Sequence, residues 1–129
     1  MRKGFTLLEL IIVIIIIGVL ATLGFTQYAK MIEKGRAAEA RSMLGTIRSA
    51  QEAYKLEYGN YTTTAADLGT ELPAACASQS THYFDYDISS AGQATADRCT
   101  SGGKNPAASA AYAVSLGYAN GTIWSTGGY

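Results

Sequence analysis

The sequence predicts an α+β fold, in which a long N-terminal α-helix packs against a small antiparallel β-sheet of three or four strands. Two observations predict the helix: no proline lies between Phe5 and Leu72, and apolar residues keep a helical spacing as far as Tyr58. A third observation predicts the sheet, because two short β-forming runs flank Asn120-Gly121, and Asn-Gly between such runs is a strong hairpin signal.

The first part of the predicted helix is apolar on all sides. Every residue in Leu10–Phe25 is apolar, glycine or threonine, and the stretch 5–25 matches the roughly 20 residues that cross the hydrocarbon core of a membrane. Because Arg2 and Lys3 precede it, the positive-inside rule keeps them in the cytoplasm and places the rest of the chain outside. A secretory signal peptide and an uncleaved anchor are the simpler alternatives. The first lacks its small-residue cleavage pattern, and neither explains the carboxylate of Glu9.

The second part of the predicted helix is amphipathic. Apolar and aromatic residues recur every three or four positions and predict one buried stripe: Ala37, Ala40, Leu44, Ile47, Ala50, Tyr54 and Tyr58. We expect Gly59-Asn60 to end the helix, because glycine is favoured just past a helix C-terminus. This half of the helix should therefore lie against a folded domain.

The remaining expected elements are short. A turn of helix is expected around residues 65–68, and strands are expected over 83–88, 111–116 and 122–125. A further strand over 94–98 is expected at an edge of the sheet.

Few residues suggest chemistry. Asp85 and Asp87 lie two residues apart and so share one face of a strand, which we interpret as a solvated face, because two carboxylates fall far short of the six to eight oxygen ligands of calcium. His82 is the single histidine, and we expect it at the surface, since no nucleophile or second acid accompanies it. We expect neither enzyme activity nor a metal or cofactor. A formal net charge of zero gives no support for a nucleic-acid partner.

Glu9 stands at the head of the apolar run, although an acidic side chain at the centre of a membrane helix costs about 2.5–3.5 kcal/mol. It therefore calls for a cationic partner. The two basic residues, the pair Gly4-Phe5 and Glu9 inside an apolar helix together resemble the class III signal of type IV pilins and pseudopilins.

The resemblance implies how the chain is processed and assembled. A prepilin peptidase would cut between Gly4 and Phe5, removing the leader 1–4, and would methylate the new amino terminus. Glu9 would pair with the terminal amine of a neighbouring subunit. Residues 5–28 would form the membrane-spanning and later filament-core half of the helix, and residues 29–129 the periplasmic or extracellular head. The implied partners are other copies of the chain in a homopolymeric filament, membrane lipid before assembly, and an inner-membrane assembly platform.

Cys76 and Cys99 are the two cysteines of the chain. An even number of cysteines in an exported domain is typical of a disulfide, so we expect the two to be joined. Two free thiols are the alternative. Many type IV pilins similarly tie a C-terminal loop to the sheet.

Three functions remain open. The resemblance fits a type IV pilin, which moves from the inner membrane to an extracellular pilus, and a type II secretion pseudopilin, whose filament stays in the periplasm. We favour the pilin, because residues 120–129 lack the calcium loop expected of a major pseudopilin. A membrane-anchored periplasmic binding domain is the alternative of a different class. Thr26 replaces the usual proline of the family, which leaves open whether Gly18–Gly24 unwinds in a filament.

Overall fold

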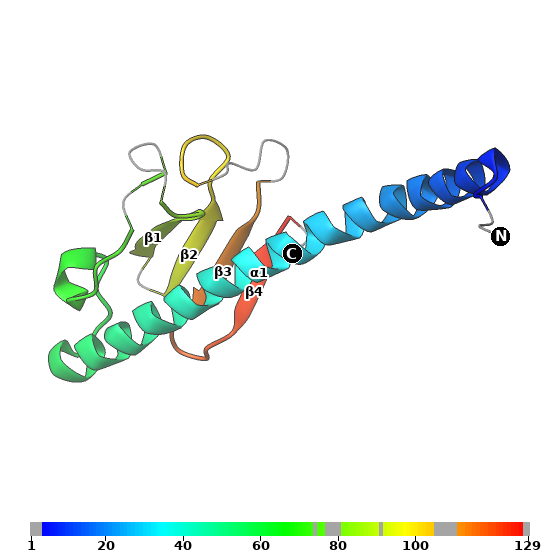
Figure 1. Cartoon of the computed structure of the whole chain (residues 1–129). Coiled ribbons are helices and arrows are strands. Elements are labelled where there is room, and N and C mark those ends of the chain that lie inside the picture. The colour runs from blue at the N-terminus through cyan, green and yellow to red at the C-terminus, as the bar shows by residue number, and fades with distance from the viewer. Residues whose placement is uncertain (1–3, 74, 77–80, 91, 105–110, 128–129) are drawn as a thin grey trace. The chain divides into compact units, whose positions relative to one another are not determined.

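The computed structural model describes residues 4–73, 75–76, 81–90, 92–104 and 111–127. The elements in chain order are α1 (Leu7–Tyr58), the short 3₁₀ helix η1 (Ala65–Leu68), β1 (Phe84–Ser90), β2 (Gln93–Arg98), β3 (Ala113–Gly117) and β4 (Ile123–Thr126). The strands form one antiparallel sheet in the order β1-β2-β3-β4 (Figure 1). The predicted α+β fold is confirmed.

The long helix ends where the sequence predicts. Gly59 takes a positive φ of 83°, and its amide donates a hydrogen bond to Lys55 O at 2.8 Å. A side chain with a Cβ rarely adopts this left-handed conformation, so the chain leaves the helix at Gly59. The turn of helix expected at residues 65–68 is η1.

The strand β2 is central, so the expectation that residues 94–98 form an edge strand was wrong. Its Ala96 pairs with Tyr86 of β1 on one side and with Val114 of β3 on the other. Ala94 and Ala96 are fully buried. Alanine is a weak β-former, so the composition of this strand did not indicate a central position, but its small side chain suits the place where the sheet packs on a helix.

The hairpin expected at Asn120-Gly121 is present between β3 and β4. Its loop is longer than two residues, since Gly117 N donates to Thr122 O and Gly121 N donates to Gly117 O, both at 3.0 Å. The loop leaves Tyr118 fully buried. Arg48 of α1 holds the loop, because its Nε donates to Tyr118 O at 2.8 Å.

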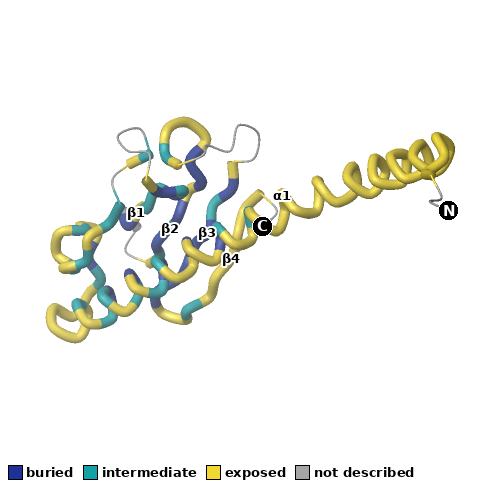
Figure 2. The backbone as a smooth tube through the Cα atoms, viewed as in Figure 1, coloured by how far each residue is buried: buried dark blue, intermediate teal, exposed yellow. Residues whose placement is uncertain are grey.

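The chain forms two compact units, Met1–Lys34 and Gly35–Tyr129. In the first unit every described residue up to Ile32 is exposed (Figure 2). The second unit, which we call the head, holds the hydrophobic core between the later part of α1 and one face of the sheet.

The predicted stripe is confirmed at Ala37, Ala40, Leu44 and Ile47, which are buried. It was wrong at Tyr58, whose side chain is 59% exposed and which stacks on the half-buried Tyr54 with ring centroids 4.4 Å apart. The stripe instead continues to Gln51, which is fully buried. A polar residue occupies the helical position that follows Leu44 and Ile47, and apolar spacing cannot reveal it.

The expectation of a surface histidine was also wrong. His82 is only 8% exposed, because it lies directly before β1 beneath the loop that follows β2. Lys104 N of that loop donates to His82 O at 2.6 Å. Within the described part of the chain, Nε2 of His82 has no hydrogen-bond partner.

Candidate functional site

The N-terminus of α1 is built by two side chains that cap each other. Thr6 precedes the first helical residue, and its hydroxyl accepts a hydrogen bond from Glu9 N at 3.2 Å. In return, Oε2 of Glu9 accepts from Thr6 N at 2.9 Å and from the Thr6 hydroxyl at 2.7 Å. This reciprocal pattern is a capping box, in which threonine and a glutamate three residues later satisfy backbone donors that the helix leaves unpaired.

The capping box changes how the carboxylate of Glu9 is understood. Sequence reasoning treated it as a charge that lacks a partner within its own chain. In the structure it accepts two hydrogen bonds from Thr6. The signal for Thr6 was present in the sequence as Thr-x-x-Glu before an apolar run. The charge of Glu9 does not reveal this partner, whereas its spacing from Thr6 does.

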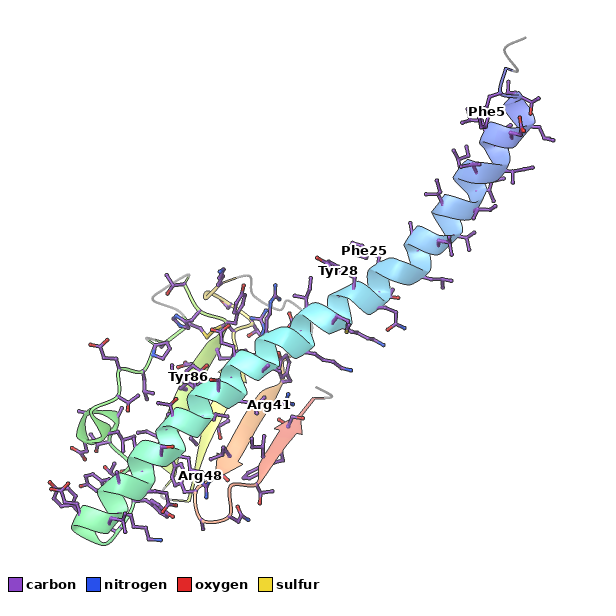
Figure 3. The ribbon with its side chains drawn as sticks, turned by 60° about the horizontal axis from the view of Figure 1, so that its bottom comes forward. Phe5, Phe25, Tyr28, Arg41, Arg48 and Tyr86 are labelled. Carbon is purple, nitrogen blue, oxygen red and sulfur yellow. A yellow bond between two sulfur atoms is a disulfide. The ribbon has the colours of Figure 1, made fainter. Side chains whose placement is uncertain are left out.

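The helix surface beyond Glu9 is apolar on every side. The side chains of the first unit radiate from the helix, as Phe25 does in Figure 3. Phe25 is 74% exposed, and Phe5, just ahead of the helix, is 83% exposed. By length and composition α1 contains a segment able to cross a membrane. A helix that is hydrophobic all round is normally buried in lipid or in protein, so this surface needs one or the other.

In the head, Cys76 and Cys99 form a disulfide with their Cα atoms 5.7 Å apart, as expected. The bridge ties the segment before β1 to the residue that follows β2. Gly103 N donates to Cys76 O at 2.7 Å, and a Cβ on Gly103 would lie 2.7 Å from the Cys99 sulfur. A glycine is therefore required where the loop crosses the bridge.

The sheet face opposite α1 carries a group of acids. Asp85 of β1 lies directly opposite Asp97 of β2, and Asp87 lies two residues further along β1. Partial desolvation raises the pKa of Asp97, and repulsion from Asp85 and then Asp87 raises it further. Among the described residues, no group of three or more acidic, histidine or cysteine side chains is placed to hold a metal ion.

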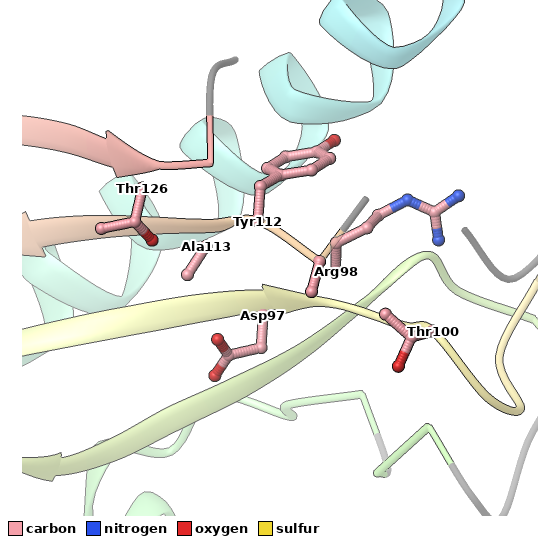
Figure 4. Close-up of a pocket in the computed structure, with 7 residues that line it drawn as sticks. Asp97, Arg98, Thr100, Tyr112, Ala113 and Thr126 are labelled. Carbon is pink, nitrogen blue, oxygen red and sulfur yellow. The ribbon is translucent and has the colours of Figure 1, made fainter. Parts of the chain in front are cut away.

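A shallow hollow of about 330 Å³ opens beside Asp97, at the ends of β2, β3 and β4 (Figure 4). The small side chain of Ala113 leaves the space, and Thr100 and Thr126 line it. Its described lining contains one carboxylate and neither histidine nor cysteine, so it offers no paired acid and base for catalysis.

The predicted site residues thus fall into two places. Phe5 and Glu9 lie at the start of α1 with Gly4, in the first unit, and Cys76 and Cys99 lie together in the head. Residues 1–3 of the expected leader lie outside the described residues.

Two family models match the chain. The model described as type IV pilin-like G and H matches residues 37–122, and the prokaryotic N-terminal methylation motif matches residues 1–25. The first match covers most of the head, and the second covers the apolar run and the residues before it.

Curated relatives include subunits of two kinds of machine. The type IV major pilin protein PilA of Myxococcus xanthus is 34% identical over 68 residues, which are 53% of this chain and 31% of the relative. The type II secretion system core protein G of Escherichia coli K12 is 41% identical over 73 residues, 57% of this chain and 50% of the relative. The type IV major fimbrial protein FimA of Dichelobacter nodosus is 40% identical over 57 residues, 44% and 36% respectively. The chain thus spans about a third to a half of the length of these relatives.

Proposed function

Because the chain belongs to the type IV pilin-like G and H family, we propose that it is the structural subunit of a bacterial type IV pilus. The subunit is held in the inner membrane by a single pass of α1, processed after Gly4, and polymerised through α1 into a filament. The observation that carries this proposal is the exposed apolar surface of residues 5–25, which lies within the match to the N-terminal methylation motif.

The physical argument concerns what can cover that surface. A lone apolar helix is stable in a lipid bilayer, and many copies of the same helix can replace lipid by packing against one another. One element therefore serves as the membrane anchor before assembly and as the filament core afterwards. The head, with its own core and its disulfide, stays folded in both states.

Processing supplies the missing cation for Glu9. Cleavage after Gly4 creates a charged amine on Phe5, and the carboxylate of Glu9 in a neighbouring copy is its counter-charge in the apolar filament core. The prepilin peptidase, which also methylates the new amine, and an inner-membrane assembly platform are the proposed partners besides other copies of the chain.

A type II secretion pseudopilin is the second candidate function. It is supported by the 41% identity to core protein G of Escherichia coli, which is close to the 40% identity to the pilin FimA. The two candidates share processing, membrane insertion and assembly. They differ in where the filament ends, since a pilus leaves the cell and a pseudopilus does not.

The test uses the full chain in its native cells. Filaments are sheared from the surface, and their N-terminal peptide is analysed by mass spectrometry. We expect surface filaments whose subunits begin at a methylated Phe5. Assembled subunits that still carry Arg2 and Lys3 would contradict the proposed processing. Filaments that are found in the periplasm and depend on a secretion system would favour the second candidate.

A further inference from the structure

The capping box at Thr6 decides where α1 begins. The first helical residue is Leu7, so Gly4, Phe5 and Thr6 lie outside the helix. The bond between Gly4 and Phe5 is the one that the proposed processing breaks. The structure thus places this bond in non-helical chain, just ahead of a helix that is otherwise continuous to Tyr58.

The conformation of this bond matters for cleavage. A peptidase must reach both sides of a peptide bond, and helical backbone hides its carbonyl and amide in intrahelical hydrogen bonds. Chain segments without such bonds are the usual sites of proteolysis. A helix that began one turn earlier would enclose the Gly4–Phe5 bond, so a fixed start at Leu7 keeps the bond available.

We propose that Thr6 is a positioning residue for processing: its hydroxyl fixes the start of α1 at Leu7 and so presents the Gly4–Phe5 bond outside the helix to the membrane peptidase. The inference rests on the proposed processing after Gly4. In that step water adds to the Gly4 carbonyl carbon and the bond to Phe5 N breaks. Gly4 leaves as a carboxylate, and Phe5 keeps a protonated amine.

The Thr6 hydroxyl makes two of the three hydrogen bonds of the capping box. It accepts from Glu9 N at 3.2 Å and donates to Glu9 Oε2 at 2.7 Å, whereas the third bond of the box uses the backbone amide of Thr6. Thr6→Ser retains all three bonds. Thr6→Ala removes both hydroxyl bonds and places a strong helix former just ahead of the residue where the helix now begins. The helix can then extend toward Gly4.

The experiment follows cleavage of the full-length precursor by pulse-chase and immunoblot in cells that contain the peptidase. We expect Thr6→Ala to slow conversion to the mature form by about 2- to 30-fold, the range that follows from losing an N-cap side chain. Thr6→Ser should be cleaved at the rate of the unsubstituted chain. The matched control is Thr22→Ala, since the Thr22 hydroxyl bonds only to Gly18 O of its own helix at 2.9 Å; it should also be cleaved normally.

A structural readout separates positioning from direct recognition of Thr6 by the peptidase. Backbone chemical shifts of the full-length precursor in detergent micelles should show Gly4 and Phe5 turning helical in Thr6→Ala but not in Thr6→Ser. The inference is overturned if Thr6→Ala is cleaved at the normal rate, if Thr6→Ser is equally slow, or if cleavage slows while the shifts stay unchanged. If the unsubstituted chain is itself not cut after Gly4, the proposed function fails instead.

Discussion

The side-chain amide of Gln51 in α1 pairs with the backbone of Thr62 in the loop that follows the helix. Nε2 of Gln51 donates to Thr62 O at 2.8 Å, and Oε1 of Gln51 accepts from Thr62 N at 3.0 Å. The two residues are 0% and 7% exposed. The amide thus satisfies both backbone groups of a buried loop residue, which would otherwise lack partners. Gln51 fastens the loop to the helix.

Gln51→Leu should lower the free energy of unfolding of the head by about 2–3 kcal/mol. The amide and carbonyl of Thr62 would lose their partners while buried, which costs about 1–3 kcal/mol for each group and roughly 2–6 kcal/mol for the two. Burial of the apolar leucine side chain offsets part of this cost. The measurement is thermal unfolding of the full chain in detergent micelles, followed by near-ultraviolet circular dichroism. Gln27→Leu is the matched control, because Gln27 is exposed in the same helix. Equal stability of Gln51→Leu and the unsubstituted chain would show that the pairing adds nothing.

Gln51 also marks the limit of what the sequence could predict about the fold. Hydrophobic spacing was enough for the helix and for the buried positions from Ala37 to Ile47, and the preference for glycine just past a helix was enough for its end at Gly59. Spacing failed where a buried position is polar, because hydrophobic periodicity cannot distinguish a buried amide from a solvated one. It also misplaced Tyr58, since an aromatic side chain at the right spacing was taken as buried although it is largely exposed.

In the candidate site, too, some features could be predicted from the sequence and others could not. The methylation motif, its apolar run and the disulfide could be recognised from the sequence. The partner of Glu9 within the chain could have been recognised too, because Thr6 stands three residues before it. The burial of His82 could not, since it depends on the loop after β2 folding over the start of β1, a contact between residues far apart in sequence.

Removing the disulfide should lower the stability of the head by roughly 3–3.5 kcal/mol, the loop-closure value for cysteines 23 positions apart. The variant is Cys76→Ala combined with Cys99→Ala, which leaves no single thiol to form mixed disulfides. Denaturant unfolding of the full chain in micelles measures the change, and mass mapping without reductant should recover the two cysteines in one linked peptide. Free thiols in exported, unreduced protein would contradict the bridge.

Asp97→Asn should stabilise the head at neutral pH. The raised pKa means that the folded state holds the Asp97 proton more tightly than the unfolded chain does. Stability is therefore lost as pH rises from the ordinary value of 3.8 through the raised pKa. Asparagine avoids this loss and the repulsion from Asp85, for a gain of about 0.2–1 kcal/mol.

The pH dependence provides the check on Asp97. Unfolding is compared at pH 7 and near pH 3, where the carboxyl is protonated in both states, so the advantage of Asp97→Asn should vanish at the lower pH. Glu71→Gln makes the same charge change at an exposed residue of the head and should alter stability little. An advantage that persists near pH 3 would mean that the carboxylate charge is not its cause.

Glu9→Val separates the two roles of the glutamate. In this variant the Thr6 hydroxyl can still accept a hydrogen bond from the backbone amide of residue 9. We therefore expect α1 still to begin at Leu7 and cleavage after Gly4 to continue. Filament yield should fall sharply, because the new amine on Phe5 would meet no counter-charge in the apolar core, and an unpaired buried charge costs several kcal/mol.

Glu9→Gln sharpens the comparison, since the amide oxygen can still accept from Thr6 while the charge is gone. Cleavage is measured by immunoblot and assembly by sheared filament yield from the same cells. A loss of filaments in both variants assigns assembly to the charge of Glu9, and a loss in Glu9→Val alone assigns it to the capping box. Normal filaments from both would end the proposed pairing between Glu9 and the amine.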